Sequence, residues 1–223
     1  GESVVKFPKG IPNPHLARTS LEDDPFPHLE IAPFLYVYHY PFDGQALVDA
    51  IEKDGDITRW NAAKVGRGDN QRIGLYRDSR SQVLTDHLSV FDPEAEIETY
   101  TELQKAAYPV LYHVERAVWD YRIKNNLKLQ DHSGWVINKY GHGGQYKVHA
   151  DHGTDDPRLL SVVCYLNTVK DGGRTFFPFQ NVATDCIEGN IVLFPSSYAY
   201  AHASEPAGRY SGEVKYSMAA FFT

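Results

Sequence analysis

The chain has 223 residues, of which 42% are hydrophobic and 13% aromatic, so it can bury a sizeable core and is expected to form a single domain, 1–223. Its formal net charge of -7 and isoelectric point near 5.8 provide no basic stripe for a phosphate backbone, which argues against nucleic acid as a partner. No apolar run approaches the roughly 18 residues of a membrane-spanning helix, so no membrane partner is expected either.

The chain has two cysteines, Cys164 and Cys186, and neither belongs to a Cys-x-x-Cys pair. Both stand in apolar, β-branched surroundings, which favours buried strand residues over a disulfide. Sparse cysteine favours a reducing compartment, and the start of the sequence shows no charged-then-apolar leader. We therefore expect a cytoplasmic location.

The first third of the chain mixes irregular and regular segments. Residues 1–30 are rich in proline and charge, which indicates an arm lying on the domain. An aromatic run over 34–40 predicts a strand, and apolar residues on one face predict a helix over 42–53. Glycines and polar residues over 55–70 predict a loop.

The longest regular element is expected between residues 92 and 126, where apolar residues recur at steps of three and four. That spacing is typical of an amphipathic helix with one buried face. The helix is expected to begin near Asp92 and Pro93, since acidic residues and proline suit a helix start. Pro109 is expected to kink or split it.

From Trp135 onwards the sequence consists of short runs of β-branched and aromatic residues separated by residues that favour turns. Eight such runs behind a helical half predict an α+β fold, with a double-stranded β-helix (jelly-roll) core. The single domain then comprises the arm over 1–30, a helix-rich support over 31–130 and a core over 135–223. The predicted strands are 135–140, 145–151, 159–167, 174–177, 182–187, 190–194, 198–203 and 213–222.

A candidate metal site stands out within this core. His149 and Asp151 are two residues apart on a predicted strand, so their side chains point to one face, and His202 can supply a third ligand. Two imidazoles and one carboxylate form the triad that holds non-haem Fe(II) with open coordination positions. Of the rival histidines, His152 is expected on the opposite face and His142 in a glycine-rich turn.

These residues and their flanking stretches resemble the Fe(II)- and 2-oxoglutarate-dependent dioxygenases, and among them the prolyl 4-hydroxylase-like branch. The resemblance runs from about Val136 to Phe222, and the first half of the chain carries fewer matching motifs. It implies that His149, Asp151 and His202 bind the iron. The stretches that carry it are 140–151, 161–167, 172–178, 189–194, His202 and 215–217.

The resemblance also implies the co-substrates 2-oxoglutarate and O2, with ascorbate as a reductant. In the family the far carboxylate of 2-oxoglutarate meets a basic residue that opens an apolar strand, which fits Lys215 better than Arg209 because glycine and glutamate soon follow the arginine. A buried carboxylate needs such a partner. In the family a tyrosine hydroxyl often meets the far carboxylate as well, and Tyr165 matches that tyrosine. Tyr140 and Tyr146 match others that line the pocket.

The implied reaction hydroxylates a C–H bond while 2-oxoglutarate is decarboxylated to succinate and CO2. A prolyl residue in a peptide or protein is the first expectation. Arg174 stands where prolyl hydroxylases commonly carry an acidic residue, which argues against a collagen-like substrate. Alternatives are another amino-acid residue, a free amino acid or small molecule, a nucleic-acid dealkylase and a non-catalytic jelly-roll module. Candidate substrate contacts, each of which could equally be a surface residue, are Trp60, Arg77, Arg80 and Arg158.

Overall fold

The computed structural model describes residues 7, 9, 11, 28–53, 60–62, 77–84 and 96–223. Most of the predicted arm over 1–30 and of the predicted loop over 55–70 lies outside these residues, as does the predicted helix start at Asp92 and Pro93. Of the arm, Phe7 is described, and it packs against the main hydrophobic core.

Two antiparallel sheets form the body of the protein, in agreement with the predicted α+β jelly roll. The large sheet has the order β1-β2-β10-β7-β12-β5-β4-β3, and the small sheet the order β6-β11-β8-β9. The N-terminal half contributes four strands to the large sheet, besides its helices. The strands of the large sheet, in that order, are His28–Ala32, Leu35–His39, Asn190–Pro195, Leu160–Tyr165, Lys215–Phe222, Val136–Tyr140, Arg80–Val83 and Asn61–Ala62, and those of the small sheet are Gly144–His149, His202–Ala207, Thr175–Phe177 and Val182–Thr184.

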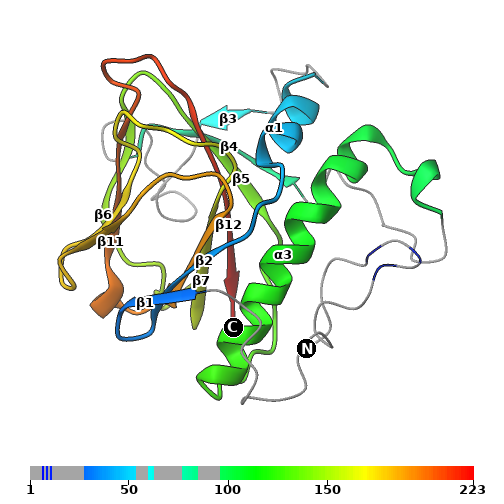
Figure 1. The fold of residues 1–223 in the computed structure, drawn as a ribbon. Helices are drawn as coiled ribbons and strands as arrows, with labels where there is room; N and C mark the ends of the chain where they lie inside the picture. The colour runs from blue at the N-terminus through cyan, green and yellow to red at the C-terminus, as the bar shows by residue number, and fades with distance from the viewer. Residues whose placement is uncertain are drawn as a thin grey trace.

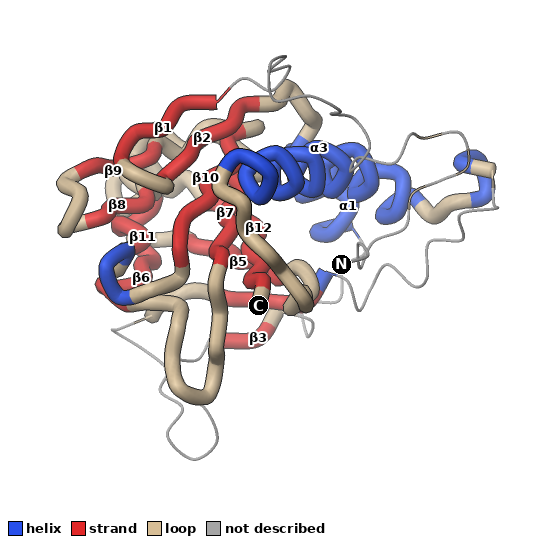
Figure 2. Tube along the Cα trace, turned by 90° about the horizontal axis from the view of Figure 1, so that it is seen from below, coloured by secondary structure: helices blue, strands red, loops and turns tan. Residues whose placement is uncertain are grey.

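Two α-helices, α1 (Gly44–Lys53) and α3 (Glu102–Lys124), lie on the same side of the strands (Figure 1). Seen from below, they run side by side across one face of the large sheet (Figure 2). The side chain of Thr101 accepts a hydrogen bond from the Gln104 N–H, and the Gln104 side chain caps the Thr101 N–H in return. This reciprocal capping box explains why α3 begins ten residues later than the acidic start that the sequence suggested.

Pro109 lies inside α3 without splitting it, so the helix is continuous from Glu102 to Lys124. Proline removes one intrahelical hydrogen bond, which costs about 3 kcal/mol in an exposed helix. Here the turns after it are held by buried side chains, Val110, Leu111 and Val114 among them, which pack in the main core. The packing of these side chains therefore outweighs the tendency of proline to interrupt a helix.

The large sheet has an apolar cluster on each face. One cluster fills the space between this sheet and the two helices, and the other lies between the two sheets. In strand β12, successive side chains point alternately to the two faces of the sheet. Met218, Ala220 and Phe222 point into the helix-side core, whereas Lys215 and Ser217 point between the sheets and line a cavity.

Several strand predictions need correction. The residues 198–203 do not form one strand, because Tyr198–Tyr200 is a 3-10 turn and β11 begins at His202. Strands β1, β3 and β4 were not predicted; the sequence of β1, HLEIA, lacks a clear alternation, and β3 lies within the predicted loop over 55–70. Both cysteines are free and buried, Cys164 in β7 and Cys186 just beyond β9. Among the described residues, no helix is long and apolar enough to cross a membrane.

Candidate iron and 2-oxoglutarate site

The three predicted ligands come together where β6 and β11 meet. His149 is the last residue of β6, His202 is the first residue of β11, and the two are direct partners in the antiparallel register. Asp151 follows in a bend, and β6 thus ends two residues earlier than the sequence predicted. One ligand atom from each residue lies within 4.8 Å of the others.

Hydrogen bonds to the backbone orient both imidazoles. His149 Nδ1 lies 2.8 Å from the Lys147 carbonyl oxygen, and His202 Nδ1 lies 3.0 Å from that of Tyr200. A carbonyl only accepts, so each Nδ1 carries the proton and each Nε2 keeps a lone pair. These Nε2 atoms lie 3.5 and 3.6 Å from the two Asp151 carboxylate oxygens. Both rings are therefore prepared to bind a metal through Nε2.

The carboxylate of Asp151 is also held in place. Ser161 donates its hydroxyl to Asp151 Oδ2 at 2.7 Å, and Ser161 Oγ lies 2.8 Å from Ser196 Oγ. Both serines are buried. Burial alone would raise the pKa of Asp151, but His202, His149 and Ser161 together hold that pKa below its ordinary value. The sequence reasoning missed the two serines, although Ser161 stands among the apolar residues at the start of β7.

The rival histidines have other contacts. His152 Nδ1 lies 2.9 Å from the Arg158 carbonyl oxygen, outside the cluster of three ligand atoms. His142 lies in the turn between β5 and β6 with a positive φ of 54°. Neither belongs to a group of metal-ligating side chains in the described part of the chain.

The three ligands fit a divalent metal ion. Metal–nitrogen and metal–oxygen bonds of about 2.1 Å place neighbouring ligand atoms roughly 3 to 3.5 Å apart. The Nε2–carboxylate distances of 3.5 and 3.6 Å approach this spacing. Burial lowers the pKa of His202, which keeps the imidazole neutral, as a ligand must be. With two imidazoles and one carboxylate, the donor set suits Fe(II).

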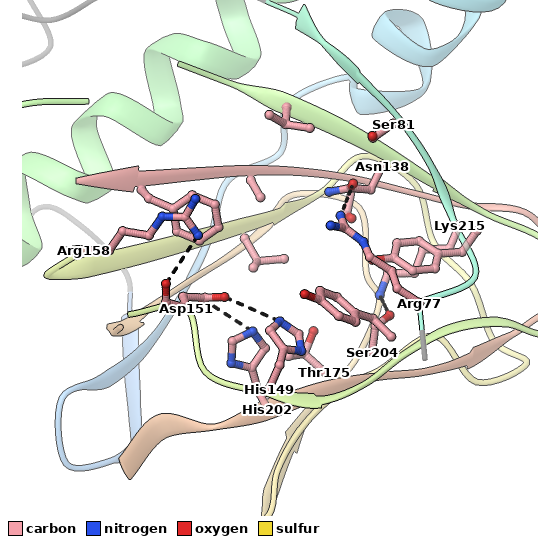
Figure 3. Close-up of a pocket in the computed structure, with 17 residues that line it drawn as sticks. Arg77, Ser81, Asn138, His149, Asp151, Arg158, Thr175, His202, Ser204 and Lys215 are labelled. Carbon is pink, nitrogen blue, oxygen red and sulfur yellow. Dashed lines mark hydrogen bonds and ion pairs between the residues drawn. The ribbon is translucent and has the colours of Figure 1, made fainter. Parts of the chain in front are cut away.

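A cavity of about 320 Å³ extends from the three ligands to Lys215 (Figure 3). Lys215 is 1% exposed, and its Nζ donates to Ser204 Oγ at 2.9 Å. Burial lowers its pKa to about 8. Gly173 lies beside it with φ +72°, and a Cβ there would approach Lys215 Cδ to 3.3 Å, so the glycine makes room for the lysine. A buried ammonium that faces a cavity fits an anionic ligand.

The three predicted tyrosines occupy different places. Tyr140 and Tyr146 line the cavity, and the Lys215 ammonium lies 5.0 Å from the centre of the Tyr140 ring. Tyr165 lies in the core between the sheets, where its hydroxyl contacts the hydroxyls of Thr175 at 2.6 Å and Thr184 at 2.5 Å. Its ring lies 5.3 Å from the same ammonium. Tyr165 therefore supports the pocket wall from behind.

Two arginines that the sequence singled out lie outside the cavity. Arg209 is exposed in the turn between β11 and β12. Arg174 forms a two-pronged ion pair with Glu205 at 2.8 and 3.0 Å on the outer side of the small sheet. The positive charge of Arg174 is thus compensated by the carboxylate of Glu205. Among the other predicted substrate contacts, Arg77 and Arg158 line the cavity, whereas Arg80 and Trp60 do not.

Known proteins share both the sequence pattern and the fold. The family model described as the 2OG-Fe(II) oxygenase superfamily matches residues 135–223. Similar solved structures include a Pseudomonas putida prolyl-4-hydroxylase (22% identity, TM-score 0.58, 85% of this chain and 92% of that chain). A Trichoplax adhaerens prolyl hydroxylase in complex with a hypoxia inducible factor peptide is 15% identical, with a TM-score of 0.62 over 85% of this chain and 83% of that one.

A viral collagen prolyl hydroxylase from Paramecium Bursaria Chlorella virus-1, in complex with 2-oxoglutarate, is 14% identical, with a TM-score of 0.53 over 85% of this chain and 95% of that one. No curated protein matched by sequence. At these identities the structures share the fold, whereas the family model covers the segment that holds all three ligands and Lys215. Residues 135–223 thus match the 2OG-Fe(II) oxygenase superfamily, whose cofactors are Fe(II), 2-oxoglutarate and O2.

Proposed function

We propose that the protein hydroxylates a prolyl residue in a peptide or protein, with conversion of 2-oxoglutarate and O2 to succinate and CO2. The observation that carries the proposal is the single cavity with the three metal ligands on one side and a buried lysine on the other. The fold shared with prolyl hydroxylases supports the substrate class.

The roles of the side chains follow from their positions. His149, Asp151 and His202 would hold the iron, which supplies the oxygen chemistry of the superfamily when it is bound. Lys215 would neutralise the far carboxylate of 2-oxoglutarate, with Tyr140 and Tyr146 along the co-substrate. The cavity is half-enclosed and small enough to limit water around the reacting groups. The protein's contribution is to orient the metal and position the two substrates.

A second candidate is a free amino acid or another small carboxylate as the hydroxylated substrate. Arg158 lines the cavity next to Asp151, with its guanidinium 3.7 Å from the Phe221 ring centre. Its Nη2 lies 3.8 Å from a carboxylate oxygen of Asp156 in an ion pair, and its Nη1 donates to the Asp151 carbonyl oxygen at 3.4 Å. A guanidinium held flat in this way keeps edge N–H groups for a carboxylate or a peptide carbonyl.

The test has two stages. Anaerobic addition of Fe(II) and then 2-oxoglutarate should produce the visible charge-transfer band of the iron–keto-acid chelate, and His149→Ala should abolish it. Proline-containing peptides and free amino acids are then incubated in parallel with O2, and products that gain one oxygen are sought by mass spectrometry.

The outcomes separate the candidates. Oxygen gain in the peptides supports the prolyl proposal, and oxygen gain in the free amino acids alone supports the second candidate. A protein that neither binds 2-oxoglutarate nor forms succinate would contradict both and favour a non-catalytic jelly-roll module.

A further inference from the structure

Three planar groups are stacked at the edge of the cavity. The Tyr146 ring lies on the His149 imidazole, with ring centres 3.5 Å apart and planes inclined by 17°. The guanidinium carbon of Arg77 lies 4.5 Å from the centre of the same Tyr146 ring. Because the imidazole covers one face of the phenol ring at van der Waals distance, the guanidinium packs against the remaining surface. Arg77 thus contacts the side chain that contacts an iron ligand.

Arg77 also stands where the chain crosses from one sheet to the other. Its backbone pairs with Tyr146 of the small sheet, and the Asp78 N–H donates to the Gln145 carbonyl at 2.7 Å. Three residues after Arg77 the chain enters β4, which pairs with β5 of the large sheet. The Arg77 side chain spans the same gap, since its Nη2 donates to Asn138 Oδ1 of β5 at 3.0 Å (Figure 3).

Besides the neighbouring His202 ring, two independent contacts hold the His149 ring. The hydrogen bond from Nδ1 to the Lys147 carbonyl fixes the rotation of the ring about its own axis. The stacked Tyr146 ring limits the swing of the whole imidazole. Tyr146 is partly exposed, so its own position depends on what packs against it. The planar guanidinium of arginine, tied to Asn138, suits this task, whereas a lysine ammonium cannot stack in the same way.

We propose that Arg77 is a positioning residue for the iron ligand His149 and acts by holding the Tyr146 ring against the imidazole. The inference rests on the iron site of the proposed function, and not on the identity of the hydroxylated substrate. It links the metal centre to a residue that lies outside the segment matched by the family model, 135–223. Partners that orient a metal ligand typically change metal affinity by 10- to 100-fold when they are lost.

The experiment measures the affinity of the full chain for Co(II) by anaerobic titration, with the visible absorption of the bound ion as the signal. Arg77→Ala and Arg77→Lys should each weaken Co(II) binding about tenfold. Tyr146→Phe keeps the ring and should lose less Co(II) affinity than Tyr146→Ala, whereas Tyr146→Ala should resemble Arg77→Ala. Adding Arg77→Ala to Tyr146→Ala should cause little further loss, because both changes remove the same support.

Arg174→Ala is the matched control, because it removes an exposed arginine that is paired with Glu205 on the outer side of the small sheet, away from the cavity. Circular dichroism of each variant establishes that it is folded, and Arg77→Lys is the least disruptive of them. If Arg77→Lys bound Co(II) as tightly as the unaltered protein, the positioning role would be overturned.

A direct contact between Arg77 and an anion predicts a different pattern. Arg77→Ala would then lose 2-oxoglutarate affinity with unchanged Co(II) affinity, and Arg77→Lys would retain both, which would also overturn the proposal. Failure of the unaltered protein to bind Co(II) would overturn the iron site itself. Equal Co(II) affinities in all variants would overturn only the role of Arg77.

Discussion

Ser161 donates a hydrogen bond to Asp151 from the middle of the large sheet, so the one carboxylate of the proposed iron site is positioned by a different strand from the one that precedes it. Ser161 is in turn within hydrogen-bonding distance of Ser196, at the end of β10. The carboxylate orientation is therefore set by the packing of three chain segments.

Ser161→Ala should weaken Fe(II) binding about tenfold, because the carboxylate loses the donor that orients it. The same change leaves the buried Ser196 hydroxyl without this contact and should lower the free energy of unfolding by about 1 to 2 kcal/mol. Anaerobic metal titration and urea denaturation measure the two effects. Ser196→Ala is the control, because it keeps the bond between Ser161 and Asp151, and a similar loss of metal affinity in both variants would contradict this account.

Lys215→Met should abolish 2-oxoglutarate binding and yet stabilise the ligand-free protein. The buried ammonium has its pKa lowered from 10.5 to about 8, which corresponds to at most about 3 kcal/mol of destabilisation at neutral pH. Methionine fills a similar volume without the charge. Calorimetric titration with 2-oxoglutarate and thermal unfolding provide the readouts. Arg209→Ala should leave co-substrate affinity unchanged, and loss of binding in that variant instead would reassign the carboxylate partner.

The affinity for 2-oxoglutarate should fall as pH rises through about 8, since the carboxylate binds the protonated form of Lys215. Well above that pH the dissociation constant should increase about tenfold per pH unit. The stability of the ligand-free protein should change in the opposite direction. The pKa of Lys215 in the folded protein lies below its unfolded value of 10.5, so the unfolded state binds more protons between these two pH values. The free energy of unfolding therefore rises with pH in that range.

Titration of 2-oxoglutarate affinity across this range, with Lys215→Arg as the comparison, checks the prediction. An arginine stays charged throughout, so any affinity that this variant retains should vary little with pH. A constant affinity in the unaltered protein across pH 8 would show that Lys215 does not titrate in the pocket.

Tyr165→Phe should lower the free energy of unfolding by about 1 to 2 kcal/mol, because the buried hydroxyls of Thr175 and Thr184 lose a shared partner. Its effect on 2-oxoglutarate affinity should be much smaller than that of Lys215→Met, since the hydroxyl points into the core. Chemical denaturation and co-substrate titration of the same sample separate the two effects. A loss of affinity as large as that of Lys215→Met would place the Tyr165 hydroxyl on the co-substrate.

The chemistry of the site was readable from the sequence because His149 and Asp151 are two residues apart and are followed by His202 and Lys215, a combination that resembles a known family. The structure brings all four residues to one cavity. Ser161 was not recognised, because a single serine in a strand is common and its partner is decided by which strand lies opposite.

The fold prediction was also limited by contacts between segments that are distant in the sequence. Periodicity located most strands of the core, but a bend after His149 and the 3-10 turn before His202 depend on contacts between β6 and β11. The role of Arg77 could not be predicted because it requires the chain to cross from the small sheet to the large one. The start of α3 was marked in the sequence by Thr101 and Gln104, a capping signal that was overlooked.

Strand β12 lies between β7 and β5, so the middle of the large sheet stays incomplete until residues 215–222 have left the ribosome. Synthesis proceeds at about 5 to 20 residues per second, and partners distant in sequence pair late in folding. Strand β12, which carries Lys215, is thus added to strands that were synthesised several seconds earlier. Iron captured by His149, Asp151 and His202 before that moment would occupy a nascent chain that still lacks the cation for the far carboxylate of 2-oxoglutarate.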